Sequence, residues 1–312
     1  MAHIILVHGI AQEQHSAAEL ETTWIPSLAG GVENAGHIDL ADQIRAGSYS
    51  IRMAFYGNQF LVPDQQGTEP NPFTDPEQTL VDELAWDLLA NACGSDDAAD
   101  AAQAKRALSA LASNRADAQG PLRRTTVRVA AGLDRIPWFS RGTLTAVASI
   151  NRTLAQVVRY LSDPSIRAYA LDQVARHLDD DTRVVIGHSL GSVVAYEALH
   201  ARRSDHLVPL FLTLGSPLAL SAIAKRIQPQ PPAFPSAVRR WVNIASPDDL
   251  VAARSNLAPI FDNNRPETAT LERTWKVDNG SKPHQATFYL TKPVTGRAVG
   301  DTLRLADRNG WR

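Results

Sequence analysis

The stretch Gly187-His188-Ser189-Leu190-Gly191 limits the fold of this chain more than any other part of the sequence. It follows an apolar run that predicts a strand at 183–188 and precedes a run that predicts a helix at 190–203. A tight turn from strand to helix brings backbone atoms so close that only small residues fit around the serine. The sequence therefore predicts a strained turn that presents the Ser189 hydroxyl at the carboxyl edge of a sheet, where open α/β sheets bind ligands.

Strand-like and helix-like segments alternate on both sides of this turn. Strands are expected at 4–7, 50–57, 183–188, 207–215, 239–245 and 270–277, the last as a polar edge strand. Helices are expected at 22–36, 77–93, 143–161, 165–178, 190–203, 221–227 and 294–308. This alternation predicts an α/β fold, with a mainly parallel central sheet and helices on both faces.

The region between the second and third expected strands is different in character. Residues 58–76 hold four prolines and predict a long loop, and no strand pattern appears before residue 181. We expect residues 1–93 and 166–312 to form the core, and 94–165 to form a helical lid or cap. Within that insertion, Trp138 and Phe139 either line a substrate pocket or fill the space between the lid helices.

The Ser189 hydroxyl is a poor nucleophile unless a base takes its proton. In α/β enzymes with a G-x-S-x-G turn, an acid and then a histidine follow the serine along the chain. Only His200, His206 and His284 follow Ser189. The first two lie in or just after the helix that Ser189 begins, which carries them about 15 Å away. This leaves His284, in a loop, as the expected base; the alternative is that Ser189 only caps its helix.

The expected acid follows the strand at 239–245. Asp248 and Asp249 are both candidates, and we favour Asp249 as the partner that orients the histidine. The other aspartate would then cap a turn or the next helix. Asp278 is the weaker candidate because it lies close to His284 in sequence and does not follow the expected strand.

Two backbone N–H groups are expected to bind an oxyanion. The Leu190 N–H lies at the start of the helix, and the Ile10 N–H follows the turn at His8-Gly9 that ends the first strand. We also expect His8, Gly9 and His188 to lie against the substrate. The alternative is a plain glycine turn with a solvated His8.

Together these residues resemble the serine-hydrolase branch of the α/β-hydrolase superfamily. The segments GHSLGSVVAYEAL, TLGSPLAL and NIASPDDLVA are similar to bacterial lipase/esterase-type members related to the PGAP-type hydrolases, and the likeness covers roughly 1–57 and 182–312. It implies that Ser189 is the nucleophile, Asp249 the acid and His284 the base, with an oxyanion hole at Ile10 and Leu190. Ser246 stands where members often have an aspartate, and the early first strand implies fewer than eight strands.

The expected activity is hydrolysis of a carboxylic ester or thioester through an acyl-enzyme on Ser189. The same residues would serve an acyltransferase, a cyclising thioesterase or an amidase. An alternative of another class is a catalytically silent interaction protein on the hydrolase scaffold.

Composition bears mainly on partners and location. A net charge of −2 and the absence of a basic, aromatic-bearing stripe argue against nucleic acid. No apolar run reaches the length of a membrane span, and no signal-peptide pattern is present. The single cysteine, Cys93, fits a reducing compartment, so we expect a cytoplasmic enzyme of a small ester, thioester or lipid. Metal-binding and phosphate-binding motifs are missing, so no metal or dissociable cofactor is expected.

Overall fold

A computed structural model describes most of the chain, and every structural statement below concerns these residues: 2–61, 73–116, 133, 136, 147–202, 206–252, 256–272 and 275–308.

The centre of the molecule is a sheet of seven strands, all parallel. The strands are β1 (Ile4–Val7), β2 (Ile51–Ala54), β3 (Val184–His188), β4 (Val208–Leu214), β5 (Val238–Ala245), β6 (Thr270–Leu271) and β7 (Trp275–Lys276). Their order is β2-β1-β3-β4-β5-β6, and β7 also pairs with β5. The predicted α/β class with a parallel sheet is confirmed.

Helices lie between most consecutive strands and cover the sheet. Those between β1 and β3 are α1 (Ala17–Asn34), α2 (Ile38–Arg45), the 3₁₀ turn η1 (Gly57–Phe60), α3 (Asp75–Ala92), α4 (Ala98–Ala116), α7 (Val147–Ser162) and α8 (Pro164–Ala175). Those after β3 are α9 (Leu190–Ala201), α10 (Ser221–Ala224), α11 (Ala258–Phe261), α12 (Ala286–Leu290) and α13 (Pro293–Arg308).

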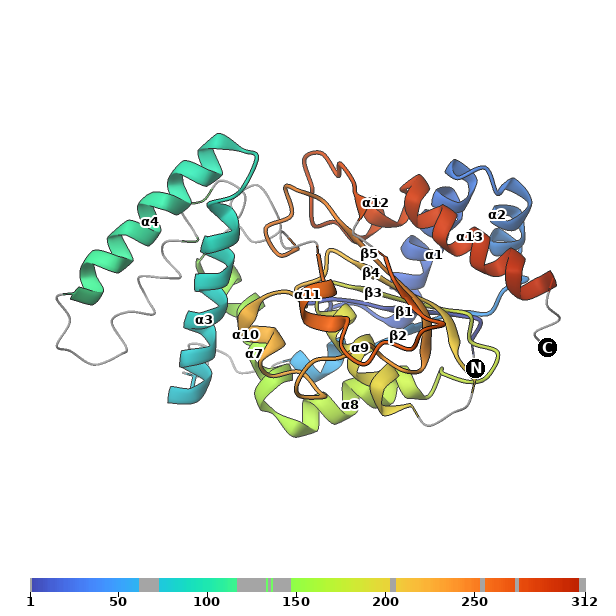
Figure 1. Cartoon of the computed structure of the whole chain (residues 1–312), viewed down its shortest axis with the longest axis horizontal. Coiled ribbons are helices and arrows are strands. Elements are labelled where there is room, and N and C mark those ends of the chain that lie inside the picture. The colour runs from blue at the N-terminus through green and yellow to red at the C-terminus, as the bar shows by residue number, and fades with distance from the viewer. Residues whose placement is uncertain are drawn as a thin grey trace.

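Side chains of each strand alternate between two hydrophobic layers, because successive residues of a strand point to opposite faces. On β1, Ile4 and Leu6 enter one layer, and Ile5 and Val7 enter the other. The first layer is covered by α1, α2, α12 and α13, and the second by α3, α7, α8, α9 and α10. In Figure 1 the first group lies to one side of the strands, and α8 and α9 lie to the other. The expected helices on both faces are therefore present.

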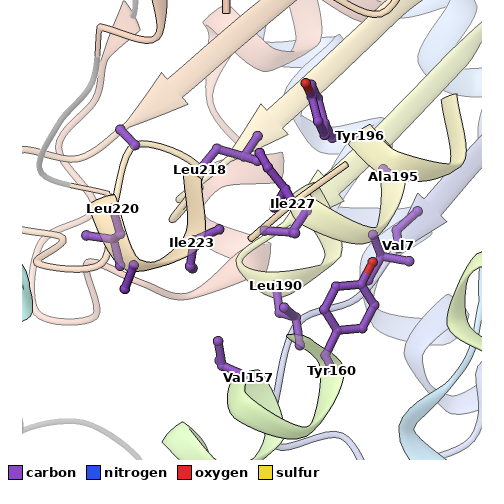
Figure 2. Packing of buried hydrophobic residues seen from close by; sticks show 14 of the residues in the cluster. Val7, Val157, Tyr160, Leu190, Ala195, Tyr196, Leu218, Leu220, Ile223 and Ile227 are labelled. Atoms are coloured by element: carbon purple, nitrogen blue, oxygen red, sulfur yellow. The ribbon is translucent and has the colours of Figure 1, made fainter. Parts of the chain in front are cut away.

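The second layer also contains the first helix after the Ser189 turn. Leu190 of α9 packs in the same cluster as Val157 and Tyr160 of α7 and Leu218 and Leu220 of the loop after β4 (Figure 2). A helix from the expected insertion thus lies against the start of α9, next to the turn of interest.

Several element boundaries differ from the sequence-based expectation. The first helix begins at Ala17, before the expected residue 22, because Ser16 caps it by accepting a hydrogen bond from the Glu19 N–H. The short helices α2, α11 and α12 were not predicted, because few residues give weak periodicity. The expected strand at 270–277 forms two short pieces, β6 and β7.

In the described residues, no strand lies between β2 and β3, as expected. Instead α3 packs against α4, α7 and α10, and α3 and α4 extend to the left in Figure 1. Trp138 and Phe139 lie outside the described residues. The division into a core and a lid at 94–165 stays a prediction.

Candidate active site

Ser189 occupies a strained turn between β3 and α9. Its backbone has φ 54° and ψ −130°, a left-handed conformation that is costly for a residue with a side chain. A methyl group at Gly187 would lie 2.6 Å from the Cα of Ser192, and one at Gly191 would lie 2.2 Å from the Val7 carbonyl oxygen. Glycines are therefore required on both sides of the serine. The Ser189 side chain makes no capping hydrogen bond to α9. This excludes the alternative that Ser189 only caps the helix.

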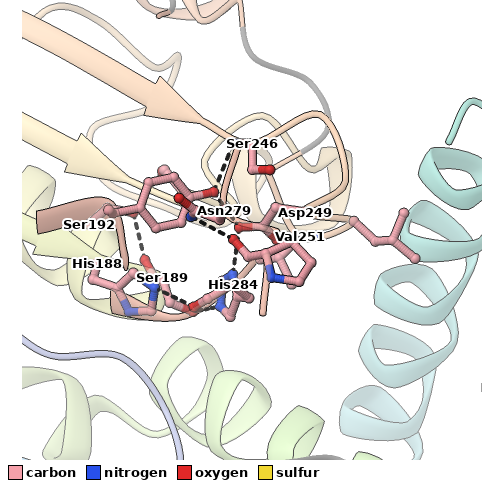
Figure 3. Close-up of polar contacts among 12 residues, drawn as sticks. His188, Ser189, Ser192, Ser246, Asp249, Val251, Asn279 and His284 are labelled. Carbon is pink, nitrogen blue, oxygen red and sulfur yellow. Dashed lines mark hydrogen bonds and ion pairs between the residues drawn. The ribbon is translucent and has the colours of Figure 1, made fainter. Parts of the chain in front are cut away.

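The Ser189 side chain instead faces a histidine and a carboxylate (Figure 3). Its Oγ lies 2.9 Å from Nε2 of His284, and Nδ1 of that histidine lies 2.8 Å from Oδ2 of Asp249. Because a carboxylate only accepts, Nδ1–H donates to Asp249 and Nε2 is left to accept the serine proton. Ser189 and Asp249 are buried, whereas His284 is partly exposed. The three residues predicted from the sequence are thus brought into one hydrogen-bonded chain.

The residues set aside in the sequence lie elsewhere. His200 bonds to the Ala233 carbonyl, and His206 lies near Asp180. Asp278 accepts a hydrogen bond from the Gly280 N–H at 2.6 Å, so it holds a turn. Of the two neighbouring aspartates, Asp249 is the one bonded to His284.

Asp249 is held by two further donors that the sequence analysis did not identify. The Tyr289 hydroxyl of α12 donates to the same Oδ2 at 2.7 Å, and the Val251 N–H donates to Oδ1 at 3.1 Å. The Tyr289 oxygen in turn accepts the Ser246 N–H at 2.9 Å. Burial and the nearby Asp249 charge raise the pKa of Tyr289 well above its ordinary value, so it stays a donor. This set of donors stabilises a fully buried carboxylate.

His188 was expected beside the substrate, but its side chain instead holds the backbone of His284, the expected base. Its Nε2–H donates to the His284 carbonyl oxygen at 2.9 Å, and the two rings lie 4.8 Å apart. Burial first, and then the nearby His284, lower the pKa of His188 well below its ordinary value. A neutral His188 therefore fixes the loop of His284 without adding charge to the site.

The residues of the two expected oxyanion donors lie close to Ser189 in the chain or in space. Leu190 is the first residue of α9, where an N–H has no partner within the helix. Gly9 lies so close that a methyl group there would be 2.7 Å from the Ser189 Cβ and 3.2 Å from Oγ. The Gly9–Ile10 peptide consequently lies directly against the serine, which is where an oxyanion donor is needed.

The His8 side chain does not have the substrate-contacting role expected for it. It is fully buried, with Nδ1–H donating to the Gly9 carbonyl at 2.7 Å and Nε2 accepting the Tyr56 N–H at 3.1 Å. Burial lowers the pKa of His8 to about 4, so the ring is neutral at neutral pH. Both ring nitrogens are used to hold backbone, which also excludes the alternative of a solvated His8.

Two serines, Ser192 and Ser216, form hydrogen bonds that support the turn at Ser189. Ser192 Oγ donates to the Ser189 carbonyl oxygen at 2.6 Å, and it lies 2.7 Å from Ser216 Oγ. Because the single Ser192 proton is used on the carbonyl, Ser216 is the donor between the two. Each directly follows a glycine, Gly191 at the start of α9 and Gly215 after β4, and this is the signal by which the sequence could have identified them.

The described residues contain no group of three His, Cys, Asp or Glu side chains that could hold a metal ion. In the same part of the chain, no helix combines the length and apolarity needed to cross a bilayer. Comparison of the whole chain with protein-family models, curated proteins and solved structures found no match. The function is therefore argued from the site itself.

Proposed function

We propose that this protein is a serine hydrolase that cleaves a carboxylic ester or thioester. The observation that carries the proposal is the unbroken chain from Ser189 Oγ through His284 to the buried Asp249, with distances of 2.9 and 2.8 Å. The strained backbone of Ser189 supports it, because strain of this kind persists only where the surrounding structure imposes it.

The reaction follows from the proton positions. His284 Nε2 accepts the proton of Ser189 as Oγ attacks the carbonyl carbon of the substrate, and Asp249 stabilises the imidazolium. The N–H groups of Ile10 and Leu190 bind the oxyanion. The imidazolium protonates the departing alcohol or thiol, leaving an acyl-enzyme on Ser189. His284 then takes a proton from water as the water oxygen attacks the acyl carbon. The bond from that carbon to Ser189 Oγ breaks, His284 returns the proton to Oγ, and the acid leaves.

The same proposal includes an α/β-hydrolase fold for the sheet and a lid role for the helices between β2 and β3. It is supported by the positions of the three residues: the nucleophile follows β3, the acid follows β5, and the histidine follows β7. Ser189 directly follows its strand, and the loops that carry Asp249 and His284 also begin at the carboxyl edge, so all three side chains can meet there.

The test is covalent labelling with a fluorophosphonate, followed by kcat/KM on p-nitrophenyl esters with acyl chains from about two to about sixteen carbons. We expect wild-type protein to be labelled at Ser189, and Ser189→Ala to lose labelling and about 10⁶-fold in kcat. The melting temperature of the variant should stay close to wild type, because the side chain makes no capping bond.

Labelling without ester turnover would move the substrate class to amides, carrier-bound thioesters or acyl transfer. Folded wild-type protein that is not labelled at all would overturn the proposal in favour of an interaction protein on a hydrolase-like scaffold.

A further inference from the structure

Gln156 is a buried amide on α7 that reaches the loop after β1. Its Oε1 accepts the Ala11 N–H at 2.9 Å, and its Nε2 donates to Glu13 Oε2 at 2.9 Å. The opposite orientation of this amide would place an N–H₂ group against an N–H and an oxygen against a carboxylate. Only 5% of the residue is exposed, so no water substitutes easily for these bonds.

The residue that Gln156 holds has an unusual backbone. Ala11 has φ 59°, which a residue with a Cβ adopts at a cost unless its surroundings fix it. The carbonyl of the same peptide, on Ile10, accepts a hydrogen bond from Gln12 Nε2 at 3.1 Å. Both ends of the Ile10–Ala11 peptide are therefore fixed, the N–H end by a side chain from another part of the chain.

The neighbouring peptide carries the proposed oxyanion donor. The His8 ring holds the Gly9 carbonyl at 2.7 Å, and in a trans peptide the Ile10 N–H points the other way. A displacement of the Ile10–Ala11 peptide would shift the Ile10 Cα, which the two peptides share, and with it this N–H. Small displacements of an oxyanion donor cost much of its effect on rate.

We propose that Gln156 is a positioning residue for the oxyanion hole, through which α7 holds the Ile10 N–H in its working orientation. This inference rests on the proposed serine-hydrolase function. Gln156 does not touch the reacting atoms; it acts through Ala11. Through its hydrogen bond to the Ala11 N–H, Gln156 connects the helices between β2 and β3 to the proposed oxyanion hole, in addition to their packing contacts.

The test compares Gln156→Leu with wild type and with a matched control, Gln173→Leu. Gln173 is a buried glutamine on α8, 6% exposed, so it receives the same chemical change in another helix. Active sites are first counted by fluorophosphonate titration. For Gln156→Leu we expect kcat per titrated site and the labelling rate constant to fall together, by about 10- to 100-fold, with KM within about twofold. Gln173→Leu should retain both rates.

Rescue distinguishes the hydrogen bond from bulk packing. Gln156→Glu alone keeps the acceptor for Ala11 but opposes the Glu13 carboxylate, so it should remain slow. Combining it with Glu13→Gln reverses the donor and acceptor between the two side chains, and kcat should return to within about threefold of wild type.

A Gln156→Leu protein with wild-type kcat and labelling rate would overturn this inference while leaving the hydrolase function intact. The same holds if only the number of titrated sites falls, since that indicates misfolding. Wild-type protein that is neither labelled nor active would overturn both proposals.

Discussion

The carboxyl edge of the sheet and the β2–β3 helices (α3, α4, α7 and α8) contribute to the site in different ways. The sheet edge supplies the side chains proposed to react, on the turn after β3 and on the loops that follow β5 and β7. The β2–β3 helices supply single buried amides that hold the loops. Gln156 of α7 holds the loop after β1, and Asn91 of α3 donates to the Leu250 carbonyl, one residue past Asp249, at 3.0 Å.

This difference has a physical basis. The turn at Ser189 ends β3, which pairs with β1 on one side and β4 on the other, so its backbone needs little support from the β2–β3 helices. The loops at 9–13 and 246–252 leave the sheet, and their peptide groups need partners from elsewhere. We therefore expect substitutions at the edge to affect folding or chemistry severely, and substitutions of the helix amides to have graded effects.

The largest effect is expected for Gly191→Ala. A methyl group there would lie 2.2 Å from the Val7 carbonyl oxygen and 2.3 Å from that of His8, both backbone atoms of the sheet edge. We expect the free energy of unfolding to fall by more than about 4 kcal/mol, measured by urea denaturation.

The matched control for this substitution is Gly30→Ala in α1, where a methyl group meets nothing within 4 Å. It should raise stability by up to about 1 kcal/mol, because alanine favours helix. Equal stability of the two variants would contradict the expectation that the sheet edge around Gly191 is too rigid to admit a methyl group.

An intermediate loss of stability is expected at acid pH, and it arises from His8, at the end of β1. His8 is neutral when folded, with a pKa of about 4, whereas an unfolded histidine titrates near its ordinary value of 6.5. As pH falls from about 6.5 to about 4, the unfolded chain binds the extra proton, so stability is lost across this window, by about 3 kcal/mol in total. Below it the loss levels off.

His8→Asn keeps a donor for the Gly9 carbonyl but removes the titrating ring. The variant should be less stable at pH 7 and should show a shallower fall in unfolding free energy between about pH 6.5 and 4, by urea denaturation at each pH. His188, whose pKa is also lowered, keeps part of the slope in both proteins. An unchanged slope would place the acid sensitivity outside the loop after β1.

The smallest effect is expected for Asn91→Ala in the β2–β3 helices. The change removes the donor to the Leu250 carbonyl, and we expect a loss of about 1–3 kcal/mol in stability and about threefold in kcat. Asn34→Ala is the control, since Asn34 makes the same kind of bond to the Thr291 carbonyl at an exposed site. That control should change stability by less than about 0.5 kcal/mol and kcat not at all. A larger kcat loss in Asn91→Ala than in Gln156→Leu would reverse the assignment of roles to the two amides.

The strands, most of the long helices and the three residues of the Ser189 chain were predictable from the sequence. Local signals carry them: apolar runs mark buried strands, glycines mark the turn at Ser189, and chain order with elimination leaves His284. Helices as short as α11 and α12 were not predicted, because they contain too few residues to show a hydrophobic period. Whether residues 94–165 form a lid stays a prediction, with Trp138 and Phe139 outside the described residues.

What the sequence determined by itself was which residues stand at the ends of strands, because backbone preference and hydrophobic period act over a few neighbours. What only the tertiary structure decided was which partner each of them meets. It placed Asp249 rather than Asp248 against His284, Tyr289 on the same carboxylate, His8 inside the protein and Gln156 on Ala11. Gln156 and Ala11 are 145 residues apart in the chain. No local pattern encodes such a meeting, because it depends on how α7 packs against the whole sheet.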